Sequence, residues 1–393
     1  MLAVLVPIGL ATLVGVVVLW PSGGRSPAEV AARASVPVGA TYPEATVKSL
    51  TSYDCSATGA DGTAQAQTCA TAVVEVEDGE QAGDVRQVDV PPDVIASGIG
   101  VGDSLVLVRD PGAEGGTSFS FYDYARRGPL LILAAAFVLV VGLVARWRGL
   151  LAVLGLVFAF AVLLLFVLPA ILHGSSPTWV ALVGSTAIMI VVLYLAHGVS
   201  ARTTTALLGT LFGLALVAVL GAIAVGVTHL TGFSSEQTVQ LQQFDPTLDF
   251  SGLVIAGVVV GGLGVLNDVT VTQASAVWQL WEVDPTLTWR ELFVRGMSIG
   301  RDHIASTIYT IVFAYAGTSL ALLLLFEIYS QPAGVVLTGS AVAEEVVRTL
   351  VGAIALVLAV PVTTAIGAVV VKASDAAGTV PRLALPGRFR ASA

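Results

Sequence analysis

The sequence is poor in charged residues and in the side chains that usually bind metals or activate nucleophiles. Only 11% of its 393 residues are charged and 55% are hydrophobic, with a mean hydropathy of +0.88. This composition excludes an ordinary water-soluble protein and indicates an integral membrane protein. The formal net charge of −9 argues against nucleic-acid binding, which requires a cationic surface.

Several common motifs are also missing. Lysine occurs only as Lys48 and Lys372, and neither lies in a Gly-x-x-x-x-Gly-Lys phosphate-binding loop. The chain contains no His-Glu-x-x-His zinc motif and no Cys-x-x-Cys pair. We therefore expect no metal and no cofactor.

Long apolar stretches are abundant instead. A bilayer core about 30 Å thick requires about 20 apolar residues per helix. Eight stretches meet or approach this length: 1–20, 129–145, 149–172, 178–197, 206–230, 252–278, 304–328 and 347–371. The predicted fold class is an α-helical polytopic membrane protein of about eight transmembrane helices, with a small extracytoplasmic β-rich domain after the first helix.

The basic residues beside these stretches predict the orientation, because Lys and Arg are retained on the cytoplasmic side. With the N-terminus inside, the cytoplasmic side holds ten: Arg146, Arg148, Arg202, Arg290, Arg295, Arg301, Lys372, Arg382, Arg388 and Arg390. The opposite side holds four: Arg25, Arg126, Arg127 and Arg348. Both termini are therefore predicted to be cytoplasmic. The first stretch lacks a basic region before it and a small-x-small cleavage site, which favours a retained anchor over a cleaved signal peptide.

Residues 21–128 differ from the rest of the chain and are predicted to form a folded domain outside the membrane. They contain 15 acidic and seven basic residues, which accounts for −8 of the net charge. Alternating apolar runs at 45–51, 70–77, 84–90 and 104–108 indicate strands of a small antiparallel barrel or sandwich. Both cysteines, Cys55 and Cys69, lie here, and export would allow them to form a disulfide. Unpaired thiols would require the inverted topology.

The predicted domains are then an anchor at 1–20, the outer domain at 21–128, a seven-helix membrane domain at 129–372 and a basic cytoplasmic tail at 373–393.

The sixth stretch contains the densest set of small and polar residues. Their spacing places them on one face of a helix: Gly257, Gly261, Gly264, Asp268, Thr272, Ser275 and Gln279. The glycines suit close helix packing. Asp268 is predicted to lie about 24 Å along the helix, where a charge costs roughly 3 kcal/mol on insertion scales. Beside it lies Asn267, the only asparagine in the chain.

The seventh and eighth stretches each add a similar narrow face. The seventh has His303, Thr307 and Thr310, and the eighth has Glu345, Arg348 and Gly352. We expect the three faces to meet in one interior seam. One interpretation is a polar pathway or gate formed by Asn267, Asp268, Thr272, Ser275, His303, Thr307 and Thr310. The other is tight packing in which hydroxyl groups or Arg301 satisfy Asp268.

Four segments give the chain a family resemblance. They are GGLGVLNDVTVTQASAVW at 261–278, GRDH at 300–303 with FAYAGTSL at 313–320, EEVVRTLVGAIALVLAVP at 344–361, and FYDYARR at 121–127. In these segments the sequence resembles the YibE/F-like family of bacterial multi-pass membrane proteins, from about residue 45 onward. It departs from the family in having Asn267 where methionine is usual and in the polar run Thr270-Val-Thr-Gln. The resemblance implies a bacterial plasma-membrane protein with a presumed transport role, and it supplies no substrate.

Two functions follow as hypotheses. The first is a transporter or permease-like component that uses the seam around Asp268, with the lipid bilayer as its environment. The alternative is that the protein is a non-transporting scaffold, sensor or assembly partner whose outer domain binds an envelope protein. An oligomer partner is the other binding partner considered. An enzyme is not expected, because Asp268 has no carboxylate companion within the predicted spans and no Ser–Lys dyad fits inside the bundle.

Overall fold

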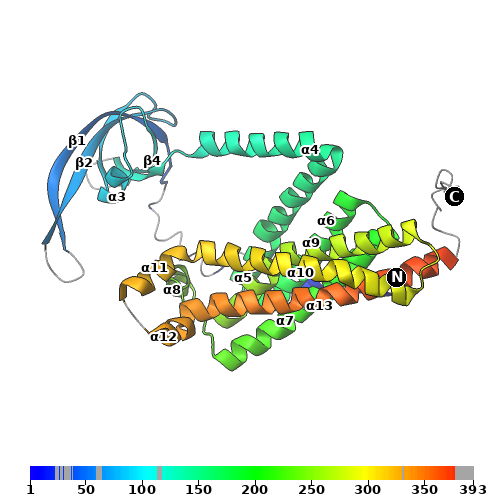
Figure 1. Ribbon diagram of the computed structural model, residues 1–393. Coiled ribbons are helices and arrows are strands. Elements are labelled where there is room, and N and C mark those ends of the chain that lie inside the picture. The colour runs from blue at the N-terminus through cyan, green and yellow to red at the C-terminus, as the bar shows by residue number, and fades with distance from the viewer. Residues whose placement is uncertain are drawn as a thin grey trace, which may run out of the picture. The chain divides into compact units, whose positions relative to one another are not determined.

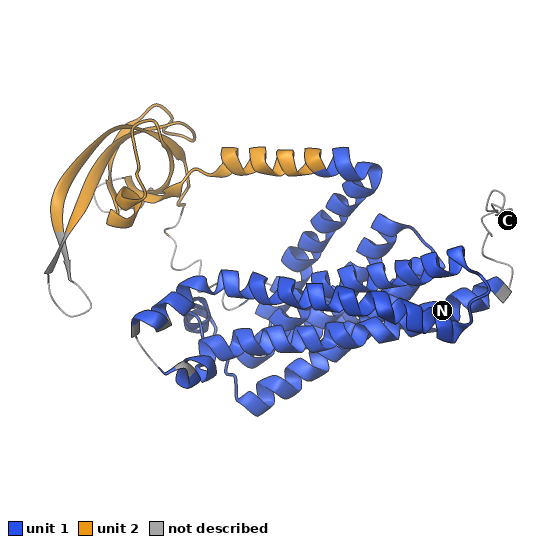
Figure 2. Ribbon diagram, in the orientation of Figure 1, with its two compact units in different colours: residues 1–29, 141–393 blue, residues 30–140 orange. Residues whose placement is uncertain are grey.

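The computed structural model describes residues 1–22, 26, 30, 37, 39–58, 64–112, 117–329 and 332–376. The chain divides into two compact units, residues 30–140 and residues 1–29 with 141–393 (Figure 2). Arg25 and the part of the predicted basic tail that contains Arg382, Arg388 and Arg390 lie outside the described residues.

The unit of residues 30–140 contains an antiparallel sheet. Its strands are β1 (Glu44–Thr58), β2 (Ala64–Val76), β3 (Val85–Val90), β4 (Ser104–Asp110) and β5 (Ser118–Tyr124), in the order β3-β2-β1-β4-β5 (Figure 1). The edge strands β3 and β5 also contact each other, so the sheet curves like a barrel. Alternate side chains of the strands, such as Val47, Val74 and Leu105, fill its core together with residues near the short helix α3 (Pro92–Ala96).

Four of these strands match the predicted runs, and the fifth was missed. Residues 118–124 alternate polar and apolar side chains, which is a strand signal, but their tyrosines and the Arg126-Arg127 pair suggested only a junction with the membrane. The Asp123 carboxylate accepts hydrogen bonds from the Arg126 guanidinium at 2.6 Å and from the Tyr124 N–H at 2.8 Å. These bonds hold the pKa of Asp123 below its usual value.

The predicted disulfide between Cys55 and Cys69 is confirmed, and it links the paired strands β1 and β2. Its removal in the variant Cys55→Ser/Cys69→Ser is expected to lower the free energy of unfolding of this unit. The loss should stay below the roughly 3 kcal/mol of the chain-entropy model, because the β1–β2 ladder already restrains the loop. Thermal unfolding followed by circular dichroism measures this change, and an unchanged melting temperature would contradict it.

The unit of residues 1–29 and 141–393 is helical, and α4 begins within the sheet-containing unit. Its helices are α1 (Leu2–Val18), α4 (Arg127–Val162) with the π-helical η1 (Leu163–Val167) and α5 (Leu168–Leu172), α6 (Pro177–His197), α7 (Ala201–Thr228), α8 (Glu236–Phe244), α9 (Phe250–Val283), α10 (Trp289–Thr318), α11 (Leu320–Tyr329), α12 (Ala333–Thr338) and α13 (Ser340–Ala376). Five described helical segments are long and apolar enough to cross a membrane: 127–172, α6, α7, α9 and 340–375. These helices support the prediction of a membrane protein, whereas the count of eight spans stays a prediction.

The differences from the expected spans have local causes. Arg146 adopts φ 56° and ψ −141°, which breaks α4 between the second and third expected stretches. Gly149 permits this corner, because a Cβ there would lie 2.7 Å from both the Val141 carbonyl oxygen and the Ala145 Cβ. The seventh expected stretch is divided between α10 and α11 at Ser319, and α1 has 17 residues.

The centre of this unit is formed by α7, α9 and α13, with α6 packed against α9 and α10 packed against α13 and α9. The close approach of α7 to α13 and α9 depends on glycines of α7. A Cβ on Gly209 would overlap the Thr363 hydroxyl of α13, and one on Gly213 would lie 2.6 Å from Leu266 of α9. These three helices therefore fit together through specific small residues.

A short, well-bonded connection sets α10 beside α9. The Thr286 O–H and N–H donate to Asp284, and the Thr288 N–H and O–H donate to Glu291 in a capping box. These hydrogen bonds hold the pKa values of Asp284 and Glu291 below their usual range. The Lys372 ammonium of α13 donates to the Pro285 carbonyl at 3.0 Å, which ties the connection to the central helices.

Candidate functional site: the polar face of α9

We define the α9 polar face as Gly257, Gly261, Gly264, Asp268, Thr272, Ser275 and Gln279. The structure leaves all seven residues exposed or half-buried and buries the adjacent face of α9 instead, which includes Leu266, Val269 and Val277. The sequence predicts that this face lies inside a seam with α10 and α13. Its residues are exposed or half-buried instead, because the side chains that α9 packs against α7 and α13 come from the adjacent face, Leu266 among them.

Asp268 is the charged residue at the middle of this face. It lies about 27 Å from the first residue of α9 and about 22 Å from the last at 1.5 Å per residue. Its side chain is 69% exposed, and its Oδ2 lies 3.9 Å from Nε2 of His303 on α10. This distance fits a weak ion pair when the imidazole is protonated and exceeds a direct hydrogen bond.

One atom of this pair is buried, and so is a polar atom of the residue before Asp268 in the sequence. Within the part of the chain that the structure describes, Nε2 of His303 and Oδ1 of Asn267 have no hydrogen-bond partner. An unsatisfied buried polar atom costs about 1–3 kcal/mol, so a bound water, ion or solute beside them would be favourable.

The other predicted polar residues of α10 bond within their own helix. The Thr307 hydroxyl donates to the His303 carbonyl at 2.8 Å, and the Thr310 hydroxyl donates to the Ser306 carbonyl at 3.2 Å. Thr307 is buried and Thr310 is exposed. Among the described residues, His303 is the predicted pathway residue of α10 whose side chain contacts Asp268.

The glycines of the polar face make room for side chains rather than for another helix. A Cβ on Gly261 would lie 3.1 Å from the Tyr315 hydroxyl, and one on Gly257 would lie 3.7 Å from the Arg348 guanidinium. The position of Gly264 is open, with nothing within 4 Å. Tyr315 of α10 and Arg348 of α13 therefore reach over the N-terminal half of this face.

A cavity of about 590 Å³ lies along the C-terminal half of the polar face. It is lined by Thr272, Ser275 and Gln279 of α9 and by Ile299 of α10, together with apolar residues. A second hollow of about 30 Å³ also touches Ser275 and is lined by His197 and Arg202. Hydroxyl and amide groups thus face open space on one side of Asp268.

A second polar cluster was missed by the sequence analysis, and it is fully buried. The Gln273 amide donates to the Gly296 carbonyl at 2.8 Å and to the Thr364 hydroxyl at 2.7 Å, while Thr210 and Thr270 share a hydrogen bond of 2.7 Å. All four side chains are at most 1% exposed. The polar run at 270–273 was a signal for this cluster, but spacing did not separate two adjacent faces of one helix.

Among the described residues, no group of three or more His, Cys, Asp and Glu side chains is arranged to bind a metal ion.

The helices that carry Asp268 and His303 lie within the region matched by a family model. The family model described as YibE/F-like protein matches residues 133–373, which is more than half of the chain. This chain belongs to the YibE/F-like family. The matched residues include α9, α10 and α13 and exclude the β-sheet and the FYDYARR junction, on which the predicted resemblance also drew. No curated protein and no solved structure matches the chain.

Proposed function

We propose that this YibE/F-like protein is a permease-like transporter, in which the α9 polar face and His303 form the path of a small polar solute. The observation that supports this most directly is the position of Asp268. Its carboxylate lies in the middle of α9 and faces the imidazole of His303 on the neighbouring helix α10. Ionisable residues at membrane depth are costly, and they commonly mark substrate or proton pathways.

The surroundings of the pair support the same proposal. On one side, Thr272, Ser275 and Gln279 face a cavity of about 590 Å³. On the other side, the Cβ position of Gly264 is open, and the Tyr315 hydroxyl lies close to Gly261. Asp268 and His303 then lie between two accessible regions, where a cationic or hydrogen-bonding solute would meet a carboxylate and an imidazole.

The proposed localisation is the bacterial plasma membrane with both termini in the cytoplasm and the β-sheet unit outside. The disulfide between Cys55 and Cys69 supports an exported position for that unit. The acidic composition of residues 21–128 supports a solvent-exposed role.

Replacing Asp268 with Asn is expected to abolish transport while the protein stays folded, because the amide keeps the shape and loses the charge. Cells that produce the wild-type chain should differ in the content of at least one small polar solute or metal ion from cells that produce Asp268→Asn at equal membrane level. Untargeted mass spectrometry of cell extracts, together with elemental analysis, measures this difference. Asp302→Asn is the matched control, because Asp302 is an exposed carboxylate next to His303. Identical profiles for wild type and Asp268→Asn would remove Asp268 from the mechanism.

A scaffold or sensor is the second candidate, and a feature of the β-sheet unit favours it. A cavity of about 370 Å³ there is lined by Tyr42, Asp78, Glu80 and Arg109, a mixed polar set suited to a protein or glycan group. Deletion of residues 21–128 separates the two functions. Unchanged solute profiles without this unit would favour transport by the helices alone, whereas loss of a captured envelope protein with no solute effect in the intact chain would favour the scaffold.

A further inference from the structure

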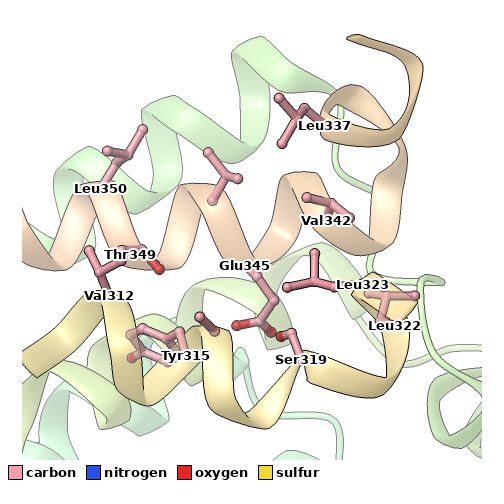
Figure 3. Close-up of a pocket in the computed structure, with 12 residues that line it drawn as sticks. Val312, Tyr315, Ser319, Leu322, Leu323, Leu337, Val342, Glu345, Thr349 and Leu350 are labelled. Atoms are coloured by element: carbon pink, nitrogen blue, oxygen red, sulfur yellow. The ribbon is translucent and has the colours of Figure 1, made fainter. Parts of the chain in front are cut away.

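A cavity separate from the 590 Å³ cavity lies at the C-terminal end of α10, among α10, α11, α12 and α13. Its volume is about 380 Å³, within the range of small-molecule sites. Figure 3 shows the carboxylate of Glu345 pointing into it beside Ser319, with the Tyr315 ring on the same wall. Most of the remaining lining is aliphatic: Val312, Leu322, Leu323, Leu337, Val342, Val346 and Leu350.

The charge of this cavity has one sign. Glu345 is the only charged residue in its lining, and the other polar groups are the hydroxyls of Tyr315, Ser319 and Thr349. Arg348 lies 3.4 Å from Glu345, but it does not line the cavity, and its guanidinium extends to within 3.7 Å of the Cβ position of Gly257 on α9.

This single guanidinium has two carboxylates within one turn of α13. Glu344 is 8% exposed, and its Oε1 has no hydrogen-bond partner within the described residues. Glu344, Glu345 and Arg348 therefore carry a net charge of −1 when ionised. A cation placed in the cavity would offset that excess, and it would also meet the face of Tyr315.

We propose that this cavity binds a lipophilic monocation, that is, a ligand with an apolar body and one positive charge. The aliphatic walls bury the apolar body, and Glu345 receives the charge. This inference does not depend on the transport proposal, because binding can be measured without flux.

Tetraphenylphosphonium is the probe for the test, and tetraphenylborate is its anionic counterpart of the same shape. Equilibrium dialysis of the full-length protein in detergent is expected to show saturable binding of about one tetraphenylphosphonium per chain. Glu345→Gln should weaken this binding by about tenfold or more, the size expected for a lost charged contact. Tetraphenylborate should not compete at this site.

Two further variants complete the test. Glu327→Gln is the matched control, because Glu327 is an exposed carboxylate of α11 outside the cavity lining, and its binding should equal that of wild type. Ala316→Trp keeps the charge and fills the cavity, so it should abolish binding. If Glu345→Gln fails to fold, Glu345→Asp serves instead, because it withdraws the carboxylate by one methylene.

Equal binding by wild type and Glu345→Gln would overturn the proposal, as would the lack of saturable binding. A phospholipid that copurifies with wild type, is lost in Ala316→Trp and is not displaced by tetraphenylphosphonium would also overturn it and would assign the cavity to lipid.

Discussion

Gln273→Glu is expected to destabilise the helical unit by more than about 3 kcal/mol at neutral pH, because it places a carboxylate in a buried site that offers only acceptors. The Gln273 amide now donates to the Gly296 carbonyl of α10 and to the Thr364 hydroxyl of α13. The Thr364 hydroxyl already donates to the Val360 carbonyl, so it has no proton left for the new carboxylate. Thermal unfolding of the purified protein in detergent, followed by tryptophan fluorescence, measures the loss.

The pH dependence of this variant identifies the cause. A protonated carboxyl group is uncharged and can donate a hydrogen bond to the Gly296 carbonyl, so the folded state of Gln273→Glu tolerates the neutral side chain better than the charged one. The destabilisation should therefore decrease as the pH falls from 8 toward 5. Gln273→Met loses the same two hydrogen bonds without a charge and should show no such change. Gln279→Glu is the exposed control on the same helix. A pH-independent loss in Gln273→Glu would refute the buried-charge explanation.

Gly209→Leu is expected to separate α7 from α13 and to cost at least the upper part of the roughly 1–3 kcal/mol that overpacking of a core usually costs. A Cβ alone would overlap the Thr363 hydroxyl and lie 3.0 Å from the Thr363 Cβ. The Thr363 hydroxyl is itself held by the Ala359 carbonyl at 2.7 Å, so rotation of this side chain also loses a hydrogen bond.

Gly264→Leu is the matched control for this substitution. Gly264 lies in α9 on the polar face, and nothing lies within 4 Å of its Cβ position, so the melting temperature should change little. Fluorescence-detected size-exclusion chromatography after heating compares the two variants in the same detergent. Equal loss in both would show that the tight α7–α13 contact is not the source of the effect.

The sequence allowed the main architecture to be predicted because its signals are long and local. Apolar stretches of about 20 residues identify spans, and period-two runs identified four of the five strands. The break at Ser319 was missed because the long apolar stretch outweighed a short local signal, the run Gly317-Thr318-Ser319.

The candidate site was only partly predictable for a related reason. Spacing placed Asp268, Thr272 and Ser275 on one face of α9, and the structure keeps them together. Spacing alone did not show which face of α9 turns toward α7. Thr270 and Gln273, three residues apart, also share one helix face, and that face is the buried one. The choice between these rows depends on partners distant in sequence, such as Thr210 and Thr364.

The glycine contacts of α7 also limit where the helical unit can change shape. Gly209 and Gly213 seat α13 and α9 so closely that sliding one helix over another would bring side chains into overlap. The two larger hollows that touch α10 lie beside Ile299 and around Val312, Tyr315 and Ala316. Gly296 and Gly300 hold α10 against α13 in the same way, with Cβ positions 2.9 Å from the Thr364 side chain and 2.7 Å from the Val360 side chain. The helices α7, α9, α10 and α13 therefore form one frame, and a change of shape in this unit would have to leave these contacts in place.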